Sequence, residues 1–86
     1  MKSSFGTEEL IKCLVNLGFS KQPSTGSSHL KYKCPNPKDV PAGTRPFIIV
    51  IENTKVYDKH TMGRYRTEIR RLGYSTTQIE EAMFPD

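Results

Sequence analysis

One short segment, residues 24 to 33, combines a turn-forming sequence with side chains that can act on a phosphate group. It reads Ser-Thr-Gly-Ser-Ser-His-Leu-Lys-Tyr-Lys and contains His29, one of only two histidines in the chain. Its second half alternates between polar and packable residues, and successive side chains of a strand point to opposite faces. The alternation therefore predicts that Tyr32 faces a core, whereas His29, Lys31 and Lys33 project together from the opposite face.

An imidazole between two ammonium groups on an open sheet face suggests phosphate chemistry. Histidine is the side chain whose unperturbed pKa lies nearest neutral pH, which suits proton transfer, and lysines can balance negative charge. Lys21, ten residues before Lys31, can add to that charge. The same pattern also fits a solvated strand face that happens to carry a histidine, because charged side chains are normally exposed.

Length and charge favour a single small domain with a polyanionic partner. The 86 residues form one domain, residues 1 to 86, and carry a net charge of +4. Residues 21 to 38 hold four lysines and no acidic residue, and residues 59 to 71 hold five basic residues against Glu68 alone. Two basic segments of this kind make nucleic acid the first candidate partner, although small proteins often carry such an imbalance without a function.

The cysteines and the hydropathy pattern argue against several protein classes. Cys13 and Cys34 are too few and too far apart for a disulfide framework or a zinc site, so we expect both to be reduced and no metal or other cofactor to be needed. No segment has the apolar length of a signal peptide or a membrane span, so we expect a cytoplasmic protein without a membrane partner.

The periodicity of apolar residues predicts an α+β fold. Leucines at helical spacing after Thr7, which we expect to be the N-cap, predict a helix, and Gly18 should close it. A second apolar stripe predicts a helix that ends at Gly73, and Thr76 should cap a short final helix. The predicted elements are a helix at 7–17, an edge strand at 19–22, a strand at 28–34, a proline-rich loop at 35–46, a strand at 47–51, and the two C-terminal helices.

This order predicts a three-stranded antiparallel sheet with the strand at 28–34 in the middle. Both long helices have one apolar face, so both should cover the same side of the sheet and leave His29 exposed on the open side. The strand at 47–51, Phe-Ile-Ile-Val-Ile, is apolar on both faces. It should either lie deep in the protein or carry a face that another chain covers.

Other polar residues have weaker functional signals. The arginines of the second helix fall off its apolar stripe and can form either a solvated face or a phosphate clamp. His60 should lie just before that helix, in a structural or solvated role. Ser27 and Ser28 are more typical of turn residues than of nucleophiles, because no aspartate–histidine partner pattern accompanies them.

In its order of motifs the chain resembles the HicA-type (YcfA-like) toxins of bacterial toxin–antitoxin systems. The matching segments are Leu-Gly-Phe at 17–19, Gly-Ser-Ser-His-Leu-Lys-Tyr at 26–32, the β-branched strand at 47–51, and Gly-Arg-Tyr-Arg-Thr-Glu-Ile-Arg-Arg-Leu-Gly-Tyr-Ser at 63–75. The chain departs from the family pattern by an extra serine before His29, by Arg64 in place of a threonine, and by a longer loop at 35–46.

The resemblance implies a double-stranded-RNA-binding-domain-like fold and an mRNA interferase, which is a metal-independent endoribonuclease. It implies that His29 is the catalytic residue and that a cognate, HicB-like antitoxin protein neutralises the toxin by covering the face around it. The residues that we expect to bind mRNA are Lys21, Ser27, Ser28, Lys31, Lys33, Arg64, Arg66 and Arg70.

Two alternative functions remain open at this point. The first is an RNA-binding module on the same fold that does not cleave its ligand. The second is a small interaction protein whose strand at 47–51 pairs with a partner chain and whose basic charge is incidental.

Overall fold

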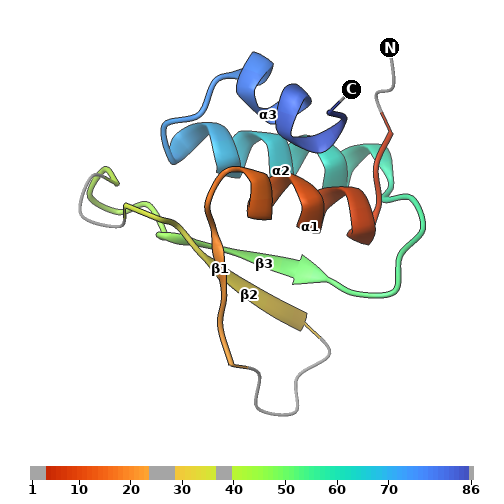
Figure 1. Ribbon diagram of the computed structural model, residues 1–86, viewed down its shortest axis with the longest axis horizontal. Coiled ribbons are helices and arrows are strands. Elements are labelled where there is room, and N and C mark those ends of the chain that lie inside the picture. The colour runs from red at the N-terminus through yellow and green to blue at the C-terminus, as the bar shows by residue number, and fades with distance from the viewer. Residues whose placement is uncertain (1–3, 24–28, 37–39, 86) are drawn as a thin grey trace.

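Helices cover one side of a three-stranded antiparallel sheet, which is the predicted α+β arrangement (Figure 1). The computed structural model describes residues 4–23, 29–36 and 40–85. Its elements, in chain order, are α1 (Thr7–Asn16), β1 (Ser20–Lys21), β2 (His29–Lys33), β3 (Phe47–Ile51), α2 (Lys59–Arg71) and α3 (Thr76–Met83). The third helix packs mainly on α1 and also contacts α2, so it lies on the side of the helices away from the sheet.

The strand order is β1-β2-β3, which places the histidine-bearing strand in the centre as predicted. In the antiparallel register between β2 and β3, His29 lies opposite Ile51 and Lys33 lies opposite Phe47. Residues directly opposite each other in a sheet share a face, so each polar residue of β2 stands beside an apolar residue of β3. The same register places Tyr32 opposite Ile48, on the side that the helices cover.

The core lies between the sheet and helices α1 and α2 and continues between these two helices and α3. Tyr32, Ile48 and Val50 are at most 4% exposed, because alternate residues of β2 and β3 point toward the helices. The helices supply buried residues from their apolar stripes: Leu10, Cys13 and Leu14 from α1, Tyr65 and Ile69 from α2, and Ile79, Ala82 and Met83 from α3.

The start of α1 differs from the prediction by one residue. Gly6, not Thr7, is the N-cap, and its backbone N–H donates to the Glu9 carboxylate at 2.8 Å. A side chain at position 6 would collide with the backbone of Lys55, since an added Cβ would lie 2.0 Å from its carbonyl oxygen. Thr7 is instead buried in the first turn, where its hydroxyl donates to the carbonyl of Ile51 at 2.6 Å.

The two Leu-Gly-aromatic sequences close α1 and α2 as predicted. Gly18 and Gly73 adopt φ angles of +94° and +104°, a left-handed conformation that glycine adopts at little cost. The aromatic residues that follow, Phe19 and Tyr74, meet with ring centroids 5.9 Å apart. The two helix ends therefore pack against each other.

The remaining helix boundaries also differ slightly from the sequence prediction. α2 begins at Lys59 and is capped by the Asp58 carboxylate, which accepts hydrogen bonds from the Thr61 hydroxyl and N–H. These bonds lower the pKa of Asp58. His60 thus lies inside the first turn of α2 and not before it. Ser75, not Thr76, is the N-cap of α3, because its hydroxyl accepts from the Gln78 N–H.

Candidate nucleic-acid interface

The open face of the sheet combines a basic strand with an apolar one. His29, Lys31 and Lys33 are exposed on β2, as predicted, and the β3 residues opposite them are half-buried. The Lys31 ammonium lies 4.2 Å from the ring centroid of Phe47, close enough for a cation–π interaction. The face therefore offers positive charge and apolar surface side by side, a combination suited to a ligand with phosphates and bases.

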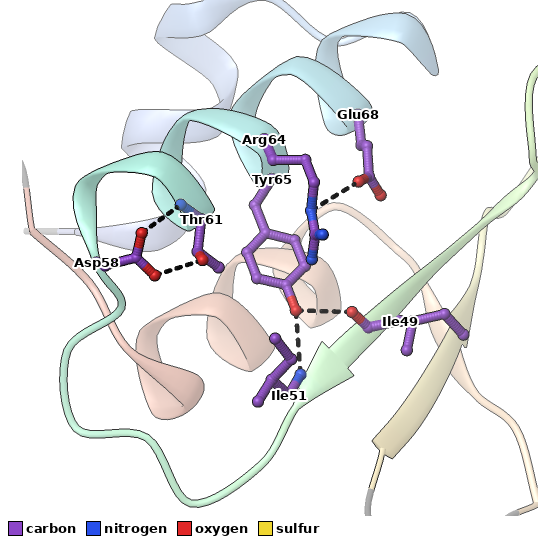
Figure 2. A network of polar contacts seen from close by, with 7 residues as sticks. All are labelled: Ile49, Ile51, Asp58, Thr61, Arg64, Tyr65 and Glu68. Atoms are coloured by element: carbon purple, nitrogen blue, oxygen red, sulfur yellow. Dashed lines mark hydrogen bonds and ion pairs between the residues drawn. The ribbon is translucent and has the colours of Figure 1, made fainter.

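Tyr65 of α2 forms hydrogen bonds with the backbone of β3. Figure 2 shows its hydroxyl between two backbone groups of this strand: it donates to the Ile49 carbonyl at 2.7 Å and accepts from the Ile51 N–H at 3.0 Å. The ring is fully buried, and burial raises the pKa of Tyr65 although the Ile51 amide and the Arg64 guanidinium oppose the shift. These two hydrogen bonds hold α2 against β3, the strand that pairs with β2.

A groove of about 630 Å³ runs along the junction of β3 and α2. Arg64, Glu68 and Arg71 contribute to it from α2, and their spacing of four and three residues places them on one face of the helix. The Arg64 side chain extends along the Tyr65 ring toward β3, and its Nε lies 3.4 Å from the Glu68 carboxylate (Figure 2). The other residues that line this β3–α2 groove are His29, Gly43, Thr44, Arg45, Phe47, Ile48, Ile49 and Ile51.

The structure brings together some of the residues predicted to bind RNA. His29 and Arg64 line the same groove, although they are 35 positions apart in the sequence. Lys31 and Lys33 stand on the open face that continues from this groove. Three of the predicted RNA-binding residues, Lys31, Lys33 and Arg64, therefore lie on the same side of the molecule as His29.

Three other predicted residues lie elsewhere. Lys21 pairs with Tyr32, whose side chain is buried, so the register places Lys21 on the opposite face of the sheet from His29. Arg66 points to α3, where it lies 3.4 Å from the Glu80 carboxylate. Arg70 borders a shallow hollow at the end of α2, outside the groove. The residues predicted to bind RNA are thus divided among different faces.

Sequence reasoning missed several groove residues. Arg71 follows Arg64 by seven positions, so a count of helical positions around Arg64 would have selected it in place of Arg66 and Arg70. Arg45 and Thr44 belong to a loop, where no periodicity indicates which way a side chain points. Ser27 and Ser28, which were also predicted to bind RNA, lie outside the described residues.

The remaining titratable groups of note belong to the core. Burial and the nearby Glu80 carboxylate raise the pKa of the Cys13 thiol to about 12, and burial raises the pKa of Tyr57 to about 12. Both groups therefore stay protonated at neutral pH. Cys34 is buried and unpaired like Cys13, as predicted. No three histidine, cysteine, aspartate or glutamate residues of the described chain gather as metal ligands would.

Comparison with known proteins identified no relative. No protein-family model matches the chain, no curated protein matches its sequence, and no solved structure matches its fold. Within residues 4–23, 29–36 and 40–85, no helix has the length and apolar character needed to cross a membrane. A function is therefore inferred from the residues and their arrangement.

Proposed function

We propose that the protein is an endoribonuclease toxin of the HicA type, which cleaves mRNA in the cytoplasm without a metal ion. One observation carries the proposal: His29 stands on the open face of the sheet and lines the same groove as Arg64. The imidazole of His29, which can transfer protons, thus lies in the same groove as the guanidinium group of Arg64. The adjoining Lys31 and Lys33 extend the positive charge along β2.

The proposed reaction uses the RNA's own 2′-hydroxyl as the nucleophile. Its oxygen forms a bond to the adjacent phosphorus while the bond from phosphorus to the 5′-oxygen breaks, which leaves a 2′,3′-cyclic phosphate and a 5′-hydroxyl. One proton leaves the 2′-hydroxyl and one is delivered to the 5′-oxygen. His29 performs one of these transfers and water the other, and the guanidinium of Arg64 stabilises the negative charge on the pentacoordinate phosphorus.

The two histidines of the chain provide a matched test of this role. The chain, a His29→Ala variant and a His60→Ala variant are each expressed in a bacterium, and growth and mRNA integrity are measured. His29→Ala should slow RNA cleavage by roughly 10²–10⁴-fold and abolish toxicity, because that is the usual contribution of a proton-transfer group. His60 lies in the first turn of α2 and is not one of the groove residues, so His60→Ala should stay toxic.

Controls on the purified proteins separate catalysis from folding. Because His29 is an exposed strand residue, its replacement should change the free energy of unfolding by about 0.5 kcal/mol or less. A chelator should leave cleavage unchanged. Full cleavage by a correctly folded His29→Ala protein would refute the catalytic role of this residue.

A non-catalytic RNA-binding module is the second candidate, and the composition of the groove favours it in one respect. Among the groove residues that the structure describes, His29 is the only histidine and Glu68 supplies the only carboxylate, which is engaged by Arg64. Retention of RNA binding by a wild-type protein that neither cleaves RNA nor arrests growth would select this function over the enzyme.

We further propose that a cognate, HicB-like antitoxin covers the open face. The face presents Lys31 and Lys33 beside Phe47 and Ile49, so it fits a partner surface with both acidic and apolar residues. In the complex, amide hydrogen exchange should slow in β2 and β3 and in residues 40–46 of the proline-rich loop. Protection confined to α3, which lies away from this face, would contradict the proposed binding mode.

A further inference from the structure

The β3–α2 groove extends well beyond His29. His29 lies opposite Ile51, the last residue of β3, whereas Phe47 at the start of β3 also lines the groove. Four residue steps along a strand cover roughly 13 Å. The groove is therefore long enough to hold more of an RNA strand than the phosphate at which cleavage would occur.

The far end of the groove has its own positive charges. β3 and α2 run in opposite directions, so the C-terminal end of α2 lies near the start of β3 (Figure 1). Arg71 from that end of α2 and Arg45 from the loop before β3 both line the groove and are exposed, and Thr44 adds a hydroxyl. Two guanidinium groups from separate elements thus border one end of a groove whose other end holds His29.

We infer that Arg45 and Arg71 form a second phosphate site, which binds a backbone phosphate of the RNA next to the one cleaved. This inference rests on the proposed function, since it assigns the site to the same ligand. A planar guanidinium can donate two parallel hydrogen bonds to a phosphate, and a pair of them can hold it from two sides. The site determines where along the strand the RNA is held relative to His29.

Glu68 lies between the two ends of the groove, and its replacement tests whether phosphates bind there. Its side chain is 38% exposed, and its carboxylate pairs with Arg64. If the groove does not bind RNA, replacing Glu68 by glutamine removes only a weak ion pair within the helix, and RNA affinity stays unchanged. If phosphates bind in the groove, the same change removes a repulsive charge and releases Arg64, so RNA affinity should rise.

The experiment measures binding apart from cleavage. A short single-stranded RNA with 2′-O-methyl groups lacks the nucleophile, so its affinity can be titrated against salt for the wild type and for Arg71→Gln, Arg45→Gln, Glu68→Gln and Arg70→Gln. Arg70 is the matched control because it is an exposed arginine of the same helix turn that borders only the other hollow, whereas Arg71 borders both that hollow and the groove. Thermal melting checks that each variant is folded.

Each phosphate site should contribute separately to the salt dependence. If about three to five phosphates are neutralised, the logarithm of wild-type affinity should fall with the logarithm of salt at a slope of roughly −2 to −4. Arg71→Gln and Arg45→Gln should each make this slope shallower by about 0.7, the value for one contact on a single strand. Glu68→Gln should bind roughly fivefold more tightly at low salt, and Arg70→Gln should keep the wild-type slope.

The outcomes distinguish this site from the proposed function. Equal losses in Arg71→Gln and Arg70→Gln, or an affinity unchanged in Glu68→Gln, would overturn the second site even if unmodified RNA is cleaved normally. Suppose that Arg71→Gln and Arg45→Gln each make the salt slope shallower, but the wild-type protein does not cleave RNA. That result would support the second phosphate site and refute only the enzyme function. A flat salt dependence of the wild type would refute both the site and RNA binding.

Discussion

The two faces of the sheet use the same strands for different purposes. On the covered face, Tyr32, Ile48 and Val50 are buried against the helices, whereas on the open face Lys31 and Ile49 remain accessible. Strand β3 is apolar on both faces, so its composition alone does not indicate which side belongs to the core. The apolar residues of this strand therefore have two roles: Ile48 and Val50 stabilise the fold, and the three residues on the other face form accessible surface beside the basic residues of β2.

The largest expected difference between the faces is in stability. Ile48→Ala removes a side chain that is 1% exposed and should lower the free energy of unfolding by about 2–5 kcal/mol. Ile49→Ala, the same change one residue later on the half-buried face, should cost at most about half as much, because less apolar area leaves water there. Denaturant unfolding of the two variants measures the difference.

Similar losses for the two isoleucines would contradict this division of the sheet. They would mean that the open face is packed in the folded protein as tightly as the covered one. In that case the surface around His29 could not receive RNA without a rearrangement of the strands.

A smaller effect is expected at the boundary between the two faces, where Tyr65 meets β3. Tyr65→Phe keeps the ring but removes the hydroxyl that bonds to Ile49 and Ile51. It should lower the free energy of unfolding by about 1–3 kcal/mol, because one carbonyl and one N–H lose their partner in a partly buried place. Chemical unfolding monitored by circular dichroism measures this change.

Tyr74→Phe is the matched control for this substitution. The Tyr74 hydroxyl donates one longer bond, 3.3 Å to the Leu17 carbonyl, and the residue is only half-buried. Its loss should therefore cost less than the loss of the Tyr65 hydroxyl. A Tyr65→Phe protein as stable as the wild type would show that α2 is not held to β3 through this group.

Much of the fold could be predicted because its determinants are local. The alternation in β2 identified Tyr32 as buried and His29 as exposed, and the glycines at 18 and 73 identified the ends of two helices. The N-cap of α1 could not be predicted in the same way. Gly6 is needed there because Lys55 approaches its backbone, and this contact joins segments about fifty positions apart.

The candidate site was less predictable, because a face of the molecule is a tertiary property. Arg66 and Arg71 look equivalent in the sequence, yet one pairs with Glu80 of α3 and the other lines the groove with His29. Charge alone groups Lys21 with Lys31, but the pairing of β1 with β2 places Lys21 on the other face of the sheet. Helical spacing could have shown that Arg71, and not Arg66, shares a helix face with Arg64. The register of a two-residue strand, in contrast, could not be read from the sequence.

The hydroxyl of Tyr65 also limits how another chain can bind this sheet. It occupies the Ile49 carbonyl and the Ile51 N–H, and the Thr7 and Tyr57 hydroxyls both reach the Ile51 carbonyl. At the other edge, β1 is two residues long and is soon followed by Pro23, which has no N–H to donate. Edge-to-edge pairing, the common route by which exposed strands aggregate or extend a sheet, therefore meets backbone groups that are already bonded at the Ile49–Ile51 end of β3. A binding partner at that end must instead recognise the side chains that the open face displays.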